Sequence, residues 1–203
     1  MPTIFCIGKN YAAHVKEMGD PVDPAGPPVV FLKPWHAQVH APDPIRIPRD
    51  CGAIHHEAEV VVRVGADLEV EAIALGLDLT DRTLQSEAKK KGHPWAAAKG
   101  FRDSAPIGPF VPASACPPID ALRFTLAVNG EIRQAGDTSL LLRPVPALLA
   151  HLDAWFGLRP GDLVFTGTPE GVASIAPDDE LVLDAPGTPA LTCHFRVEVP
   201  PRV

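Results

Sequence analysis

Two glutamates stand one residue apart at the start of an apolar run, in the stretch HHEAEVVV that covers residues 55–62. In an extended strand, residues i and i+2 face the same side, so Glu57 and Glu59 are expected to point together. Two carboxylates on one face at the edge of a core repel each other and lose hydration, unless a cation lies between them. Carboxylate oxygens suit hard divalent ions such as Mg²⁺ and Mn²⁺. The pair therefore points towards a metal-dependent enzyme, although a solvated or lysine-paired strand end gives the same pattern.

Asp78 is a third acid in apolar surroundings, within the run LGLDLT at 75–80. A buried, ionised aspartate must be paired or coordinated. Together with Glu57 and Glu59 it would supply three ligands of an octahedral ion and leave the other positions to water and substrate. The alternative is that Asp78 caps the helix that follows it. The two histidines before Glu57 do not show the spacing typical of zinc ligands.

Three further features could act on a substrate beside such a metal. His14 and Glu17 lie three residues apart in a predicted helix, so they share a face and could deprotonate a water molecule; an exposed surface pair is the alternative. Lys99 is flanked by apolar and small residues and could pair with a buried carboxylate or an anionic substrate, although a surface lysine fits equally well. The turn TGTPEG at 166–171 could hold a carboxylate with its amides and hydroxyls.

The overall composition narrows the function classes. The 203 residues carry a formal net charge of −7, with 46% hydrophobic and 21% charged residues, as in an ordinary globular protein. The acidic balance argues against nucleic acid and anionic membranes as partners, and no stretch is long enough to span a bilayer. The first residues show no leader-like pattern, and four cysteines occur singly at positions 6, 51, 116 and 193. We therefore expect a cytoplasmic protein with free thiols.

The elements that must position these residues are mostly short strands, because 24 prolines and 16 glycines punctuate the chain. Strands are predicted over 4–8, 29–33, 44–47, 57–64, 72–79, 163–166, 180–184 and 190–199. The Asn-Gly pair at 129–130 predicts a hairpin between 124–128 and 131–134. Helices are predicted over 11–18, capped by Asn10, over 81–90, and over 144–156 from its apolar periodicity. The chain is thus predicted to be a β-rich α+β protein, with one catalytic domain over 1–203 whose N-terminal segment is 1–40.

Several short motifs follow one another in a characteristic order. They are GKNY at 8–11 with His14 and Glu17, FLKP at 31–34, HEAE at 56–59, LDLT at 77–80 with Arg82 and Gln85, KKKG at 89–92, AK at 98–99, VNG at 128–130, GD at 161–162 and TGTP at 166–169. In this order the chain resembles the fumarylacetoacetate hydrolase family, above all its short acylpyruvase and oxaloacetate decarboxylase-like members. The likeness covers nearly the whole chain.

The resemblance implies a mixed β-sandwich roll that forms a homodimer and binds one Mg²⁺ or Mn²⁺ per subunit. It implies that Glu57, Glu59 and Asp78 are the metal ligands. It also implies that His14 and Glu17 lie on a lid helix that closes over the substrate and activates water.

Other positions match the family's substrate-contacting residues. Lys99 matches its active-site lysine, and Thr168 matches a threonine that contacts the substrate carboxylate. The full set of expected substrate-binding residues is Lys9, Tyr11, Arg82, Gln85 and Thr168. Two departures are notable: Lys9 stands where arginine is common, and the bulky Trp35-His36 pair replaces small residues, which predicts a narrower pocket or a different acyl group.

The chemistry of such a site follows from its charges. A 2-oxo acid can chelate the metal, and the metal together with Lys99 would stabilise the pyruvate enolate that leaves when the C3–C4 bond breaks. We therefore predict a Mg²⁺-dependent hydrolase of acylpyruvate-type 2,4-dioxo acids such as fumarylpyruvate or acetylpyruvate. Oxaloacetate decarboxylation is the first alternative, because it needs no attacking water. A 5-carboxymethyl-2-hydroxymuconate isomerase or decarboxylase activity is the second, and a catalytically silent protein that binds a metal and a dicarboxylate is the non-enzymatic one.

Overall fold

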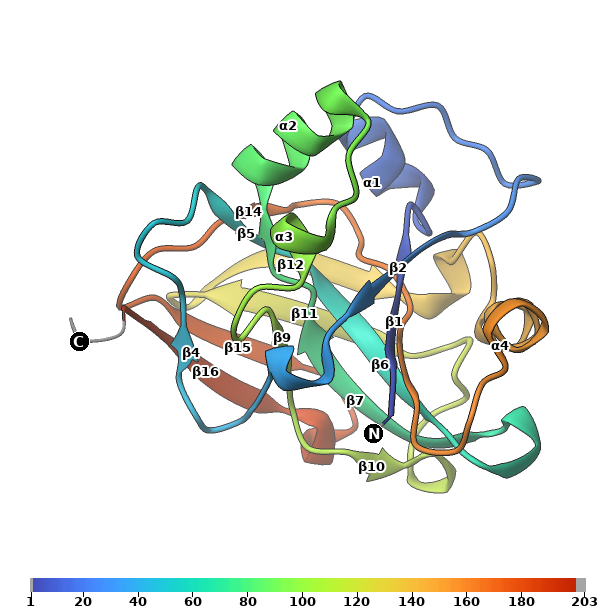
Figure 1. Ribbon diagram of the computed structural model, residues 1–203. Helices are drawn as coiled ribbons and strands as arrows, with labels where there is room; N and C mark the ends of the chain where they lie inside the picture. The colour runs from blue at the N-terminus through green and yellow to red at the C-terminus, as the bar shows by residue number, and fades with distance from the viewer. Residues whose placement is uncertain (1, 200–203) are drawn as a thin grey trace.

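The structure is a computed structural model that describes residues 2–199 (Figure 1). Within this range the largest sheet runs in the order β2-β1-β13-β6-β7-β9-β3, and β10 pairs with β7. Its strands are β1 (Ile4–Gly8), β2 (Val29–Lys33), β3 (Gln38–His40), β6 (Ala58–Val64), β7 (Val70–Leu77), β9 (Ala105–Ile107), β10 (Val111–Pro112) and β13 (Leu163–Phe165). The sheet is mixed, because β1 and β13 pair in parallel, as do β3 and β9, while β6 and β7 are antiparallel.

A second sheet has the order β12-β11-β15-β16-β4, and a small third one the order β14-β5-β8. Their strands are β4 (Ile45–Arg46), β5 (Ile54–His56), β8 (Thr80–Asp81), β11 (Arg123–Val128), β12 (Glu131–Asp137), β14 (Ala173–Ser174), β15 (Glu180–Asp184) and β16 (Cys193–Glu198). The hairpin predicted at Asn129-Gly130 is the connection between β11 and β12, and both turn residues have the positive φ that this turn requires.

Helices are few, and three of them gather at one end of the sheets (Figure 1). They are α1 (Ala12–Glu17), α2 (Arg82–Lys91) and α3 (Ala96–Lys99), while α4 (Val145–Phe156) lies beside the large sheet. Short 3₁₀ turns occur at Trp35–Ala37, Ala66–Leu68, Ala113–Ala115, Thr138–Leu140 and Pro189–Leu191. The predicted β-rich α+β class is confirmed. Across residues 2–199, no helix has both the length and the apolarity needed to cross a membrane.

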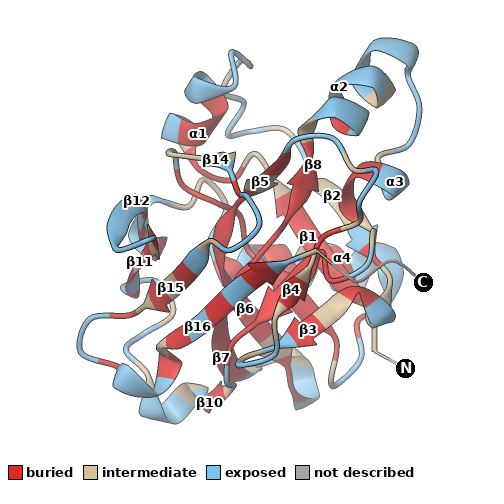
Figure 2. Cartoon of the chain, turned by 90° about the vertical axis from the view of Figure 1, so that its left-hand side faces the viewer, coloured by how far each residue is buried: buried red, intermediate tan, exposed pale blue. Residues whose placement is uncertain are grey.

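The sequence of β6 contains an unbroken apolar run because the strand is buried on both faces. Val60 and Val62 pack in the main cluster, which also holds residues of the second sheet such as Leu126 and Leu183. Val61 points the other way into a smaller cluster. A strand buried on both faces needs apolar side chains at successive positions, so the run does not alternate. Figure 2 shows the continuous buried interior along β6 and β7.

The alternative role of Asp78 as a helix cap is excluded, and the predicted cap at Asn10 is wrong. Helix α2 is capped by Asp81, whose Oδ1 accepts a hydrogen bond from the Leu84 amide at 2.9 Å, so Asp78 does not cap it. Asn10 does not cap α1, because its side-chain amide donates to the carbonyls of Arg143, at 3.1 Å, and Thr166, at 2.8 Å. Asn10 therefore ties the start of α1 to the end of β13 and to the segment before α4.

Candidate metal centre and active site

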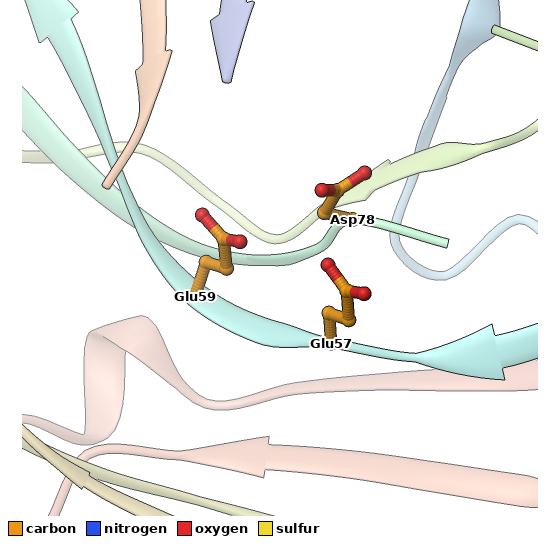
Figure 3. A group of neighbouring side chains, drawn as sticks. All are labelled: Glu57, Glu59 and Asp78. Carbon is orange, nitrogen blue, oxygen red and sulfur yellow. The ribbon is translucent and has the colours of Figure 1, made fainter. Parts of the chain in front are cut away.

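The three predicted acids meet where β6 and β7 pair (Figure 3). Glu57 precedes β6, Glu59 lies within it, and Asp78 follows β7. All three are buried, and one oxygen from each lies within 4.8 Å of the others. The register pairs Glu59 with Gly76, two residues before Asp78. A Cβ atom on Gly76 would lie 2.8 Å from the Pro106 carbonyl oxygen, so the close approach of the strands beside the acids requires glycine.

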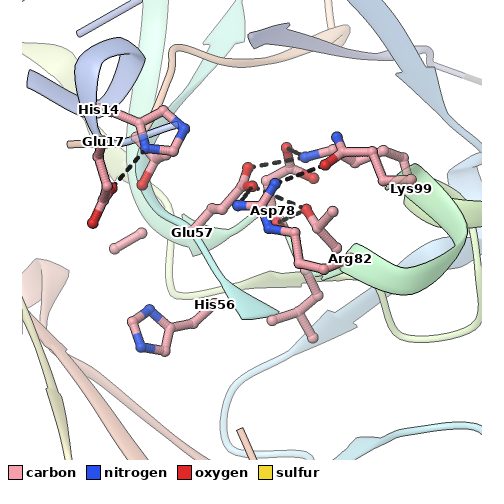
Figure 4. Close-up of polar contacts among 12 residues, drawn as sticks. His14, Glu17, His56, Glu57, Asp78, Arg82 and Lys99 are labelled. Carbon is pink, nitrogen blue, oxygen red and sulfur yellow. Dashed lines mark hydrogen bonds and ion pairs between the residues drawn. The ribbon is translucent and has the colours of Figure 1, made fainter. Parts of the chain in front are cut away.

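Three cations, of which Lys33 and Lys99 are buried, face two of these acids. The Lys99 ammonium donates to Glu57 Oε2 at 2.9 Å and to Asp78 Oδ2 at 2.6 Å. The Arg82 guanidinium donates to Glu57 Oε1 at 2.6 Å. The Lys33 ammonium lies 2.8 Å from Asp78 Oδ1. Lys99 and Arg82 were predicted to lie at the site, and the structure places both beside Glu57 (Figure 4).

Lys33 is a site residue that the sequence motifs did not single out for chemistry. Besides its ion pair with Asp78, its ammonium donates to the carbonyl of Leu79 at 3.0 Å and to that of Lys99. It therefore joins the end of β2, the segment after β7 and the last residue of α3. A lysine at the end of an apolar strand gives no local sign of such long-range partners, although it lies in the FLKP motif.

Glu57 and Asp78 have cations beside them, whereas Glu59 has none among the described residues. Burial alone would raise the pKa of Glu57, but Lys99 and Arg82 hold it well below its usual value. Burial and the neighbouring Asp78 and Glu57 raise the pKa of Glu59, and the Gly167 amide that donates to its Oε2 at 2.7 Å offsets this only in part. Glu59 is thus the acid that most needs a further cation. Three carboxylate donors, one of them without a cationic partner among the described residues, fit a hard divalent ion.

Helix α1 places the predicted His–Glu pair beside the acids. His14 Nδ1 lies 3.1 Å from Glu17 Oε2, and the Gly171 amide donates to Glu17 Oε1 at 3.0 Å. The Glu17 carboxylate is therefore held from both sides. His14 lines a narrow cavity of about 40 Å³ together with Glu57 and Lys99. Figure 4 shows the pair on one side of Glu57 and Lys99 on the other.

The remaining predicted substrate contacts divide into two groups. Lys9 and Gln85 line the narrow cavity, and Gln85 Oε1 accepts from Arg82 Nη1 at 2.8 Å. Tyr11 is buried and lines a separate cavity beside Leu140. Thr168 is buried as well, and its hydroxyl accepts from Gln134 Nε2 at 2.9 Å. Neither Tyr11 nor Thr168 is among the described residues that line the narrow cavity.

Gln134 on β12 is a second residue that sequence reasoning missed. Its Oε1 accepts from His56 Nδ1 and from the Ala58 amide, both at 2.9 Å. Its Nε2 donates to Thr168 Oγ1 and to the Pro169 carbonyl, both at 2.9 Å. Burial lowers the pKa of His56, which favours the neutral imidazole that can donate from Nδ1. Gln134 therefore connects the strand of metal-ligand candidates with the loop after β13.

Replacing Gln134 with leucine is expected to lower the free energy of unfolding by about 2–4 kcal/mol, because the Ala58 amide and the Pro169 carbonyl lose their buried partner. Urea unfolding followed by circular dichroism measures the change. The control is Gln38→Leu, since the half-buried Gln38 side chain makes one hydrogen bond within the described part of the chain, to the Trp35 carbonyl at 3.0 Å. Equal losses in the two variants would contradict the central role of Gln134.

An acidic triad lies beside fixed cations and a His–Glu pair, and Glu57, Lys99 and His14 of this group border one narrow cavity. This arrangement is that of an enzyme site rather than a structural ion site. The family model described as fumarylacetoacetate (FAA) hydrolase C-terminal matches residues 3–196. The chain therefore belongs to the fumarylacetoacetate hydrolase family.

Known relatives carry more than one activity in their names. A mitochondrial oxaloacetate tautomerase, FAHD1, from Rattus norvegicus is 40% identical over 96% of this chain and 91% of its own length. The oxaloacetate tautomerase YcgM of Escherichia coli is 39% identical over 91% of this chain and 88% of its own. The crystal structure of fumarylpyruvate hydrolase from Pseudomonas aeruginosa with Mn²⁺ and pyruvate has a TM-score of 0.89 and 36% identity, covering 98% of this chain and 91% of that one. Tautomerisation of oxaloacetate was not among the reactions expected from the motifs.

Proposed function

We propose that the protein is a divalent-metal-dependent enzyme that interconverts the keto and enol forms of oxaloacetate or a similarly short 2-oxo dicarboxylic acid. The observation that carries this proposal is the narrow cavity of about 40 Å³ between Glu57 and α1. Its small volume favours a short substrate over a long one. Its lining has a positive excess, which suits a ligand with two carboxylates. The cations are Lys9, Arg82, Lys89 and Lys99, and the acids are Glu57 and Asp20, the latter 2.9 Å from the Lys9 ammonium.

The formal charges of the site support a dianion. The acids Glu57, Glu59 and Asp78 are balanced by Lys33, Lys99 and Arg82, so the group is neutral as a whole. A bound divalent ion therefore brings an excess charge of two, which a dicarboxylate cancels. Held by the three acids, Mg²⁺ or Mn²⁺ would supply a Lewis acid that makes the C3 protons of a 2-oxo acid more acidic.

The chain's own residues have separate tasks in this reaction. Lys99 is held as an ammonium, because Asp78 and Glu57 raise its pKa despite burial, so it stabilises the negative charge of the enolate rather than taking a proton. His14 borders the cavity, and its Nδ1 is occupied by Glu17. Its Nε2 has no hydrogen-bond partner among residues 2–199, so this atom can carry a proton between C3 and the C2 oxygen.

Hydrolysis of acylpyruvates is the second candidate, supported by the way that Glu17 is fixed by His14 and the Gly171 amide. In this reaction His14 takes a proton from water, and the hydroxide adds to the acyl carbon C4. The C3–C4 bond then breaks, its electron pair stays on C3 as the enolate, and a proton converts the enolate to pyruvate. A carboxylic acid is the other product.

One set of assays separates these reactions. Enol absorbance and pyruvate are followed for oxaloacetate, acetylpyruvate and fumarylpyruvate, with Mg²⁺ or with EDTA. Metal-dependent relaxation of enol-oxaloacetate without pyruvate supports the tautomerase. Pyruvate from a dioxo acid supports the hydrolase, and pyruvate from oxaloacetate supports the decarboxylase expected from the sequence. An absence of turnover with all three substrates would reject the proposal and favour the muconate isomerase branch or a silent binding protein.

Replacing Glu17 with glutamine is expected to lower acylpyruvate hydrolysis by about 100-fold, because the imidazolium formed when His14 deprotonates water loses its stabilising charge. Tautomerisation should fall by about 10-fold or less, because the C3 proton that His14 takes is already acidified and needs less help from Glu17 than a proton of water does. Initial rates of both reactions measure the difference. Glu170→Gln is the control, since Glu170 is exposed. Equal losses in both reactions would mean that Glu17 only holds α1 in place.

The homodimer and the cytoplasmic location stay predictions. Size-exclusion chromatography with light scattering tests the first, and cell fractionation tests the second.

A further inference from the structure

An open groove of about 430 Å³ adjoins the narrow cavity. Three residues, Phe31, Trp95 and Lys99, line both spaces. The rest of the groove follows β2 and the segment before α3, with apolar side chains such as Val29 and Leu32. The site lysine therefore borders two different spaces, one narrow and one wide.

The wall between the two spaces consists of the Phe31 and Trp95 rings. Their centroids lie 6.1 Å apart with the planes tilted by 59°. The Lys99 ammonium lies 4.6 Å from the centroid of Phe31, and the Lys89 ammonium 5.5 Å from that of Trp95. Cation–π contacts thus support both rings. Trp35, which the sequence suggested would narrow the pocket, packs instead against the smaller apolar cluster and lines neither space.

The two spaces differ in chemistry. The narrow cavity is bordered by the charged side chains of Lys9, Arg82 and Lys89. Apart from Lys99, the groove is lined by residues without a fixed charge, and its one titratable side chain is the exposed His93. A carboxylate in the groove would have few partners, whereas methylene groups would lose their contact with water.

We propose that the Phe31–Trp95 wall sets the substrate length by separating the narrow cavity from this groove, whose chemistry suits the uncharged apolar acyl tail of a 2,4-dioxo acid. With the wall in place, a short dicarboxylate fits beside Lys99. With the wall removed, the tail of a longer acid reaches the groove. The inference rests on the proposed function, because the 2-oxo acid head must lie beside Lys99.

Trp95→Ala is the direct test, because it joins the two spaces while keeping Lys99. For the variant, kcat/KM with hexanoylpyruvate should rise, and its ratio to kcat/KM with oxaloacetate should increase by about 10-fold or more. Fumarylpyruvate, whose tail ends in a carboxylate, should gain less. General damage to the fold can only lower rates, so an absolute rise for the long substrate identifies the subsite. A ratio that stays at the wild-type value would overturn the proposal.

Binding gives a readout that does not depend on turnover. Calorimetry with the Mn²⁺-loaded protein compares 2-oxooctanoate with 2-oxobutanoate, neither of which has a C4 carbonyl to be attacked. Trp95→Ala should tighten the first about 10-fold relative to the second, and adding Leu32→Asp should reverse this gain. Trp155→Ala is the control, because Trp155 is 75% exposed on α4. An unchanged preference in Trp95→Ala refutes the groove; a shifted preference in a protein that turns over no 2-oxo acid supports the groove and refutes the proposed function.

Discussion

Glu59→Gln is expected to abolish metal-dependent turnover while making the metal-free protein more stable at neutral pH. Glu59 is 1% exposed, and glutamine keeps its shape and its acceptor for the Gly167 amide. The variant loses the charge that a divalent ion needs, so turnover should fall by at least about 100-fold. It also loses the repulsion from Asp78 and Glu57 that destabilises the metal-free protein.

The gain in stability has a defined pH dependence. Burial, Asp78 and Glu57 raise the pKa of Glu59 above its ordinary value of 4.5, so the folded protein binds this proton more tightly than the unfolded chain. Glu59 therefore contributes to stability below pH 4.5, where its carboxyl is protonated. This contribution is lost as the pH rises above 4.5. Glutamine does not titrate. The advantage of Glu59→Gln in EDTA should be larger at pH 8 than at pH 5.5.

Thermal unfolding at both pH values, in EDTA and then with Mn²⁺, measures both effects. Wild-type protein should gain melting temperature with the metal, because the ion binds the folded state, and Glu59→Gln should gain little. Glu180→Gln, at an exposed position of β15, serves as the control. A Glu59→Gln protein with the full metal-induced gain would exclude Glu59 as a ligand.

The fold could be predicted from sequence where elements are long and apolar. The run at β6 and the periodic face of α4 were identified because burial imposes a repeating pattern on many residues. The pattern misses some elements of two to four residues, such as β5, β8 and α3. These short elements nevertheless hold Glu57 and Lys99 in place, because long-range pairing rather than local preference decides their conformation.

The residues of the site also fall into those that the sequence could predict and those that it could not. Glu57 and Glu59 could be placed together from their spacing, and Asp78 from its apolar neighbours. Lys33 and Gln134 could not, because their partners lie far away in the sequence, as with Leu79 for Lys33 and His56 for Gln134. The wall formed by Phe31 and Trp95 joins β2 to the segment before α3, so it too leaves no local signal.

Lys99→Met is expected to destabilise the metal-free protein, whereas Glu59→Gln is expected to stabilise it. The Lys99 ammonium bridges Glu57 and Asp78, so its removal leaves two buried carboxylates without that cation. The free energy of unfolding without metal should fall by about 3–5 kcal/mol. A divalent ion then relieves more repulsion than in the wild type, so the metal-induced rise in melting temperature should be larger. Turnover at saturating metal should still fall by about 100–1000-fold, because the enolate loses its ammonium.

Lys33→Met tests whether a buried cation only stabilises the metal-free protein or also acts on the substrate. Lys33 pairs with Asp78 but does not line the narrow cavity, so its loss should destabilise the metal-free protein while affecting turnover at saturating Mn²⁺ less than Lys99→Met does. Unfolding in EDTA and kcat for enol-oxaloacetate measure the two effects separately. If Lys33→Met lowered kcat as far as Lys99→Met, the charge balance of the triad would explain both losses. If kcat fell sharply only in Lys99→Met, the ammonium that borders the cavity would be the group acting on the substrate.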